Sequence, residues 1–280
     1  MNTPAPGAPR RWNEENTVEH PIIEWLLTPE LGWRFENQRE VNERYRTDEV
    51  EALLLPILRR KLRELNPAVI TDDARADVIL TKLRATRDNV EWLKWMRNEE
   101  THRFGAEENS QQIKLIDYDN LKNNDYLCTN QFWVDGGDHR IRTDVLLFVN
   151  GIPLVNIEAK TAARDRHVDW REGARQCGRY LREAPRLYDS NIFCIAVNEI
   201  ALRYGVPGVK FHYWQSWRSA NPHSHVASDD ELKSGIHGLC DRANLLDITR
   251  ARTLLGWSPK ISLEEGLSRH IAHLKQQLVG

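Results

Sequence analysis

The sequence predicts an α/β protein, with helices first and then a mixed, mainly antiparallel sheet with a helix packed on it. Three observations predict this class. Apolar residues recur at helical spacing before residue 86. Short apolar segments of strand length follow between residues 114 and 197. A long amphipathic segment, residues 170–183, precedes the last of these strands, so a helix should cover the sheet.

Helices are expected in the N-terminal region. The first should cover residues 18–27 behind a Thr17 cap. The second should cover residues 47–65, where Pro56 should kink or split it. A third should cover residues 73–85, beginning at Asp72 and Asp73. Residues 1–13 should form a disordered tail, and residues 216–230 a polar loop.

The strands of the sheet are expected between these helices and residue 197. Each is a short run rich in apolar and β-branched residues. The expected strands cover residues 114–117, 130–134, 144–149, 154–160 and 191–197.

The composition of the chain limits the classes of function that the protein can have. The chain has 280 residues, of which 40% are hydrophobic and 29% charged, so a packed domain is expected. A net charge of −2 excludes a protein that coats nucleic acid by bulk charge, but it allows a local basic groove. The four cysteines lack zinc-site spacing and should be reduced thiols. With no signal peptide and no membrane-length apolar run, we expect a cytoplasmic protein without membrane contact.

An Asn-Gly pair at residues 150–151 lies between two apolar segments, which is a strong signal for a β-hairpin. A hairpin brings its open ends together, so Asp144 should meet Glu158-Ala159-Lys160. Because side chains alternate along a strand, Glu158 and Lys160 should share one face while Ala159 points the other way. Charged groups in so apolar a setting are costly without a partner, which predicts a metal ion or a solvated cleft there.

The register of this hairpin decides whether the acidic groups meet. A two-residue loop in regular register places Asp144 opposite Ile157 and turns Glu158 to the wrong face. A three-residue loop or a bulge places Asp144 opposite Glu158. Pro153 cannot donate to the ladder and favours an irregularity there. A regular two-residue hairpin would contradict this geometry.

The carboxylates of Asp144 and Glu158, with the carbonyl of Ala159, form an oxygen donor set suited to Mg²⁺, with Mn²⁺ as an alternative. Lys160 would orient the attacking water or help to deprotonate it, and the metal would stabilise charge developing on a phosphate. The alternative is a salt-bridged strand end, in which Lys160 pairs with Asp144 or Glu158. The pattern is short and common, so both interpretations stay open.

The pattern Asp144…Glu158-x-Lys160 resembles the PD-(D/E)xK nuclease motif, with Thr143 in place of the proline. The surrounding segments resemble one family, the nuclease domain of the restriction (R) subunit of type I restriction–modification enzymes. Residues 176–180, Gln-Cys-Gly-Arg-Tyr, match its QxxxY motif. The other segments that carry the resemblance are residues 115–118, 123–126, 130–132 and 148–154.

The resemblance covers residues 14–247 and implies a restriction-endonuclease-like, RecB-like core, which hydrolyses DNA phosphodiester bonds with Mg²⁺. It also implies a metal-binding acidic residue on the first helix, for which Glu19 fits best and Glu24 second. Gln176 and Tyr180 share a helix face and would organise the site and nearby DNA. For this pair, an ordinary amphipathic helix is the alternative.

Arginines gather beside the proposed site. Residues 161–186 hold seven arginines against four acidic residues, an excess suited to phosphates. We expect DNA contacts from Arg164, Arg166, Arg175 and Arg179. The alternative is a solvated helix face with ion pairs. Nothing in this segment specifies a base sequence, and in the family that task belongs to a separate specificity subunit.

The end of the chain departs from the family. No phosphate-binding G-x-x-x-x-G-K-[ST] motif occurs, so no ATP site and no ATP-driven motor are expected in this chain. Residues 248–280 resemble the tail of NAD-dependent nucleotide-sugar epimerases and dehydratases, but no G-x-G-x-x-G motif supports an NAD site. A helix is expected over residues 263–278. We interpret the chain as an R-subunit nuclease domain truncated before its motor and joined to a foreign end.

Three functions remain open at this point. The first is an active Mg²⁺-dependent endonuclease of the type I restriction class. The second is a catalytically silent remnant that keeps the fold and binds DNA or a complex with methyltransferase and specificity subunits. The third is a free-standing repair nuclease of the same superfamily. A nuclease assay with Mg²⁺ distinguishes them.

Overall fold

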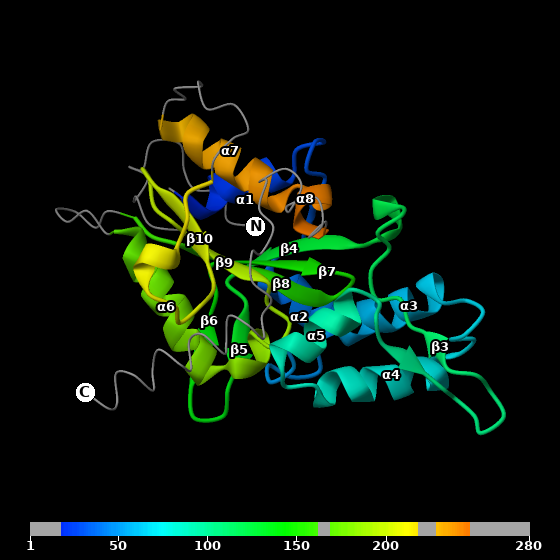
Figure 1. Ribbon diagram of the computed structural model, residues 1–280. Helices are drawn as coiled ribbons and strands as arrows, with labels where there is room; N and C mark the ends of the chain where they lie inside the picture. Colours follow the sequence, from blue (N-terminus) through cyan, green and yellow to red (C-terminus); the bar gives the residue numbers. More distant parts are fainter. Residues whose placement is uncertain (1–17, 162–168, 218–227, 247–280) are drawn as a thin grey trace, which may run out of the picture.

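The computed structural model describes residues 18–161, 169–217 and 228–246, the side chains of 228–231 excepted. Its centre is a six-stranded mixed sheet in the order β1-β4-β7-β8-β9-β10 (Figure 1). β1 pairs with β4 and β8 with β9 in parallel, and the other pairs are antiparallel, which confirms the predicted mixed sheet. The strands are β1 (Arg34–Phe35), β4 (Tyr126–Asn130), β7 (Val145–Val149), β8 (Ile152–Ala159), β9 (Phe193–Val197) and β10 (Leu202–Gly205).

Helices cover both faces of this sheet. Alternate residues such as Val145 and Leu147 pack with α1 (His20–Leu26), α7 (Ser228–Cys240) and α8 (Arg242–Leu246). The intervening Leu146 and Phe148 pack with α2 (Gln38–Tyr45) and the predicted helix α6 (Trp170–Glu183). Figure 1 shows α1 and α7 above the sheet and α6 below it. Every residue of β7 and β8 is buried, which explains their near-continuous apolar sequence.

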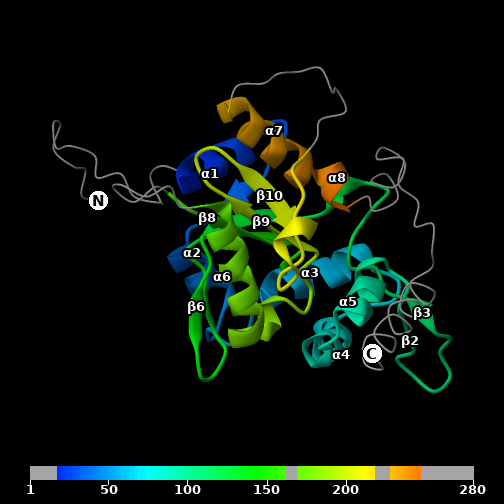
Figure 2. The same cartoon turned by 60° about the vertical axis from the view of Figure 1, so that its left-hand side comes forward.

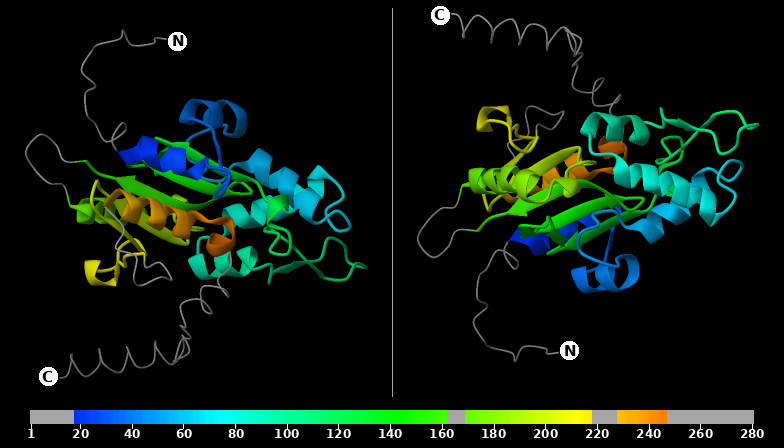
Figure 3. Two further views of the ribbon diagram at one scale, coloured as in Figure 1. Left: turned by 90° about the horizontal axis from the view of Figure 1, so that it is seen from above. Right: turned by 90° about the horizontal axis from the view of Figure 1, so that it is seen from below.

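A group of helices lies at the hairpin-turn end of the sheet, seen from above and below in Figure 3. It comprises α3 (Leu55–Leu65), α4 (Asp73–Ala85) and α5 (Asn89–Met96). The prediction for residues 73–85 is confirmed, and the side chain of Asp72 caps that helix by accepting from the Arg75 N–H. The expected helix over residues 47–65 is wrong in its first half. It starts at Leu55, and Pro56 lies in its first turn, where a missing N–H costs nothing.

Two predicted strands are also wrong. Residues 114–117 form no ladder, because the Asn98 side chain accepts from the N–H of the buried Leu115 and donates to the carbonyl of the buried Ile116. Residues 130–134 are divided, because Gln131 adopts a left-handed φ of 52° that ends β4. The pairs outside the main sheet are β2 (Thr101–His102) with β3 (Gln111–Gln112), and β5 (Trp133–Asp135) with β6 (Arg140–Arg142).

The remaining sequence predictions concern a loop, the two ends of the chain and the cysteines. The predicted loop over 216–230 ends earlier, because α7 begins at Ser228, and residues 218–227 lie outside the described part. The expected N-terminal tail, the Thr17 cap and the epimerase-like tail also lie outside it. All four cysteines are buried and free, as expected for reduced thiols. Within the described ranges, no helix is long and apolar enough to cross a membrane.

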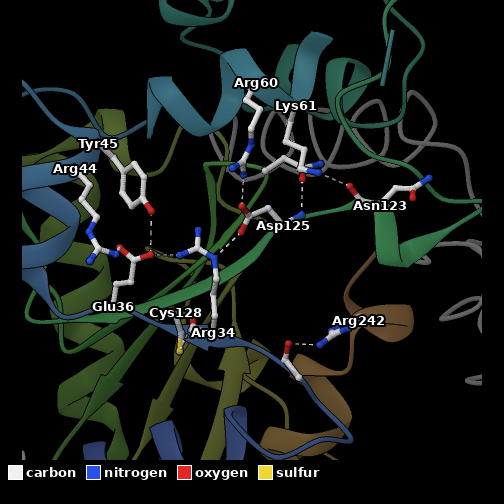
Figure 4. A network of polar contacts seen from close by, with 12 residues as sticks. Arg34, Glu36, Arg44, Tyr45, Arg60, Lys61, Asn123, Asp125, Cys128 and Arg242 are labelled. Atoms are coloured by element: carbon white, nitrogen blue, oxygen red, sulfur yellow. Dashed lines mark hydrogen bonds and ion pairs between the residues drawn. The ribbon is translucent and has the colours of Figure 1, made fainter. Parts of the chain in front are cut away.

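A network of alternating charges ties the sheet edge to the helices (Figure 4). Arg34 of β1 binds Asp125 at 2.9 Å and also pairs with Glu36, and Arg60 of α3 binds the other oxygen of Asp125 at 2.5 Å. The Tyr45 hydroxyl of α2 donates to Glu36 at 2.9 Å. Because β1 is an edge strand, these contacts stabilise an edge that would otherwise expose unpaired backbone groups.

Candidate active site

The β7–β8 hairpin has the irregular register on which the site prediction depends. Val149 pairs with Ile152 across a two-residue turn, but the register shifts between Leu147 and Phe148, so that Val145 pairs with Ile157. The bulge leaves one extra residue in β8 and brings Asp144 level with Glu158. The predicted irregularity beside Pro153 is therefore confirmed.

The ammonium group of Lys160 marks the point where the oxygen atoms of the site converge. Its Nζ donates to the Ala159 carbonyl at 2.8 Å and lies 3.3 Å from Asp144 Oδ2. The nearer oxygen of Glu158, Oε2, is 3.7 Å away. These are the three groups that the sequence nominated as metal ligands, and all of them face one positive charge. Asp144, Glu158 and Lys160 are all buried.

Asp144 is held in place by hydrogen bonds from other residues to both its side chain and its backbone. Its Oδ2 accepts from the Ala159 N–H at 2.8 Å, and its carbonyl accepts from the Gln131 N–H at 2.9 Å. The carboxylate therefore binds both the backbone and the ammonium group of the strand opposite. Such contacts hold its second oxygen, Oδ1, in a defined position beside the cluster.

Glu158 is fully buried, and α6 packs directly over it. A Cβ added to Gly173 would lie 3.1 Å from the Glu158 carbonyl, so any larger residue would push α6 and β8 slightly apart. Burial and the neighbouring Asp144 carboxylate raise the pKa of Glu158 well above its usual range, while Lys160 opposes the rise. Oε1 accepts from Asn156 at 3.1 Å, but the buried Oε2 accepts no hydrogen bond from any residue that the structure describes. An unsatisfied buried carboxylate oxygen in a cluster of acidic groups is typical of a functional site.

Glu19 is buried, whereas Glu24 is exposed on α1, so the structure favours the first choice of acidic residue. Glu19 accepts from the Gln131 side chain at 2.9 and 2.8 Å. The Gln131 backbone in turn binds Asp144. Glu19 is thus linked to the cluster through Gln131. The described residues include no group of three or more Asp, Glu, His or Cys placed to hold a metal ion. Direct ligation by Glu19 stays a prediction.

Gln176 and Tyr180 meet on one face of α6, as their spacing predicts. Gln176 Nε2 donates to the Tyr180 hydroxyl at 2.6 Å, and this hydroxyl donates to the Arg142 carbonyl at 2.7 Å. Burial and the nearby Glu158 raise the pKa of Tyr180 to about 12, so the phenol keeps its proton at neutral pH. The pair therefore fixes the backbone that leads into Asp144.

Two of the four arginines predicted to bind DNA, Arg175 and Arg179, lie within the described residues, and their DNA contacts stay a prediction. Arg175 pairs with Glu172 at 2.8 Å, and Arg179 pairs with Glu183 at 3.5 Å, both on the exposed side of α6. These are the solvated helix pairs that the alternative interpretation described. Arg164 and Arg166 lie outside the described residues.

Sequence reasoning missed two groups that support Glu158. Asn156 lies two residues earlier on the same face of β8 and binds both Glu158 and the Tyr188 hydroxyl, the latter at 3.0 Å. A polar residue within a buried apolar strand was the available signal. Tyr188 gave no local signal, because its contact spans many residues of chain.

Comparison with known proteins identifies the family. Residues 11–210 match the family model of the type I restriction enzyme R protein N terminus. The chain belongs to this family. The match contains the whole cluster around Asp144, Glu158 and Lys160, so the buried charges lie within a type I restriction R-protein domain rather than in an appended segment.

Curated relatives carry related names. The type I restriction enzyme HindI endonuclease subunit of Haemophilus influenzae is 26% identical over 84% of this chain and 23% of its own length. The putative type I restriction enzyme MjaIXP endonuclease subunit of Methanocaldococcus jannaschii is 24% identical over 79% of this chain and 21% of its own. The putative MjaVIIP subunit from the same organism is 41% identical over 91 residues. The chain thus spans less than a quarter of these relatives.

Proposed function

We propose that this chain is a Mg²⁺-dependent endonuclease domain that hydrolyses DNA phosphodiester bonds in a cytoplasmic type I restriction system. One observation carries the proposal. The Asp144 carboxylate, the Glu158 carboxylate and the Ala159 carbonyl all face one buried cationic position at the open end of the hairpin. The match to R-protein N termini supports DNA as the substrate. Methyltransferase and specificity subunits are the proposed partners.

The donor set fits a hard divalent cation. Mg²⁺ and Mn²⁺ prefer carboxylate and carbonyl oxygens, which are the groups gathered here. Glu158 Oε2 is buried and accepts no hydrogen bond from the described residues, and burial together with the Asp144 carboxylate raises the pKa of Glu158. Asp144, Glu158 and the Ala159 carbonyl would hold the metal, with Glu19 acting through Gln131 or as a further ligand.

Each residue then has a definite task. When bound, the metal supplies stabilisation of the negative charge that develops on the phosphate. Lys160 lies beside both carboxylates, and its ammonium group can orient the attacking water by donating a hydrogen bond and can stabilise the hydroxide that forms when a base removes the water's proton. Gln176 and Tyr180 hold the chain before Asp144, so that the carboxylate stays aimed at the cluster.

A second candidate is a silent domain that binds DNA or its partner subunits without cutting. The observation in its favour is that Lys160 already lies within ion-pair distance of both carboxylates. A buried, internally neutralised cluster is also a stable structural arrangement when its geometry is good.

Cleavage of supercoiled plasmid and linear DNA, with Mg²⁺ or with EDTA, tests the proposal. The chain should be assayed alone and with methyltransferase and specificity subunits. Asp144→Asn and Lys160→Ala should each lower the rate by about 100-fold or more, because the groups act at the reacting phosphate. Arg39→Ala, which removes an exposed pair with Glu43, should cut at the wild-type rate.

Cleavage that survives either site substitution would overturn the assigned site. Absence of wild-type cleavage in every mixture would favour the silent domain.

A further inference from the structure

The pairing of β4 with β7 continues beyond the central sheet as a two-stranded ribbon, which is formed by β5 and β6. After β4 and before β7, the chain keeps antiparallel contacts through the Gln131 N–H to the Asp144 carbonyl and the Thr143 N–H to the Phe132 carbonyl. β5 and β6 then pair with one another. Figure 2 shows this ribbon running alongside α6 and extending past it. Asp144 therefore lies where the sheet ends and the ribbon begins.

The two faces of the ribbon differ in chemistry. Val134 and Ile141 pair across it and are buried in the core beneath α6. Trp133 and Arg142 form the next cross-strand pair on the opposite face. The guanidinium groups of Arg142 and Arg140 lie 5.6 and 4.1 Å from the Trp133 ring centroid. The outer face is thus an indole ring flanked by two guanidinium groups.

The two arginines differ in their partners. Arg140 is bound to Glu49 at 2.6 Å, so its charge is already neutralised. Arg142 is exposed and has no carboxylate within ion-pair distance among residues 18–161, 169–217 and 228–246. Its backbone is fixed, because its carbonyl accepts from Tyr180 at 2.7 Å. Arg142 is therefore an anchored positive charge two residues before Asp144, and no carboxylate of the described ranges neutralises it.

We propose that this outer face, formed by Trp133 and Arg142, binds the phosphate backbone of duplex DNA next to the bond that is cut. The inference rests on the proposed function, since it places the substrate of that site. A guanidinium group binds a phosphate through two parallel hydrogen bonds. The Trp133 ring limits the orientations that the Arg142 side chain adopts, which lowers the entropy lost on binding. The ribbon would position the duplex without reading its sequence.

DNA binding by the full chain tests the inference, with fluorescence anisotropy of a labelled duplex in EDTA, which stops metal-dependent cleavage. Arg142→Ala should raise Kd by about tenfold on any sequence and lower the slope of log K against log salt by about 0.9. Arg142→Lys should recover part of the affinity. Arg63→Ala is the matched control, because it removes an equal charge from α3, where Arg63 pairs with Asp73. It should change Kd less than twofold.

The outcomes separate this inference from the proposed function. A chain that cuts DNA but binds it equally well with and without Arg142 would overturn the inference and leave the nuclease intact. Weaker binding by Arg142→Ala in a chain that never cuts would support the ribbon and contradict the nuclease. Absence of duplex binding by the wild type at low salt, or an equal loss in Arg63→Ala, would also overturn the inference. Equal melting temperatures of all variants would show that each is folded.

Discussion

The buried charges of Asp144, Glu158 and Lys160 determine the chemistry that this protein can perform. Placing ionised groups at the end of an apolar hairpin costs several kcal/mol per ion unless partners compensate. Here the compensation is incomplete, because Glu158 Oε2 is buried and accepts no hydrogen bond within the part of the chain that the structure describes. A cluster of this kind weakens the metal-free fold, and a divalent cation would recover that loss.

The first prediction at this scale concerns Glu158→Gln. The raised pKa of Glu158 means that the unfolded state ionises first, at about pH 4.3, so the folded state becomes less stable as pH rises above this value. A neutral glutamine has no such penalty. In EDTA the variant should therefore melt above the wild type at pH 8, and the difference should shrink towards pH 5.

Differential scanning calorimetry across this pH range measures the effect. Glu43→Gln, which neutralises an exposed carboxylate on α2, is the control and should not melt above the wild type at pH 8, because it removes no buried charge. A Glu158→Gln variant that melts below the wild type at pH 8 would mean that Lys160 already compensates Glu158 fully.

Residue-scale predictions from the sequence succeeded where the signal was local. The hairpin that brings Asp144 to Glu158 and Lys160, and the shared helix face of Gln176 and Tyr180, follow from spacing along the chain, while the role proposed for the Gln176–Tyr180 pair rests on the family resemblance. Gln131 and Arg142 were not assigned roles, because their contacts with Glu19 and Trp133 depend on how separate elements pack.

The β7–β8 hairpin is the element that assembles the site, and its turn lies in close contact with the start of α3. Asn150 and Gly151 both adopt positive φ angles, of 53° and 82°. A Cβ on Gly151 would lie 2.7 Å from the Leu54 carbonyl at the start of α3. The turn thus packs closely against the start of α3.

Gly151→Ala should therefore destabilise the protein through both strain and a clash. We expect a loss of about 2–3 kcal/mol in the free energy of unfolding, measured by urea titration. Gly137→Ala is the matched control, because Gly137 has a φ of 98° but no atom within 4 Å of an added Cβ. It should lose only about 1 kcal/mol, from strain alone. Equal losses would show that the packing against α3 contributes nothing.

Errors in the predicted elements have physical causes that lie outside the local pattern. Residues 47–54 carry buried Leu53 and Leu54 at helical spacing, yet they form no helix, and the Leu54 N–H binds the Gly151 carbonyl instead. Residues 114–117 contain the buried Leu115 and Ile116, but side-chain amides of Asn66 and Asn98 take the place of a neighbouring strand. Tertiary partners decided both cases, and a single segment does not show them.

At the scale of the whole molecule, the sheet separates two layers with different tasks. The layer of α1 and α7 is largely apolar, and it reaches beyond the residues matched by the family model, since the Trp33 indole donates to the Cys240 carbonyl at 2.9 Å. The layer beneath α6 holds Glu158, Asn156 and Tyr188. The near-zero net charge of the chain does not show this arrangement, because the carboxylates of the site are buried, whereas the Arg142 side chain of the ribbon is exposed.

The central claim is that the open end of the β7–β8 hairpin is a divalent-cation site in which Lys160 occupies the cation position when the metal is absent. Calorimetric titration of the full chain with Mn²⁺ tests it without requiring cleavage or partner subunits. Asp144→Asn and Glu158→Gln should weaken binding at least tenfold, because each removes a charged ligand. Lys160→Met should bind Mn²⁺ more tightly than the wild type, because no ammonium group competes. Equal affinity in the wild type and both carboxylate variants, or weaker binding in Lys160→Met, would contradict the claim.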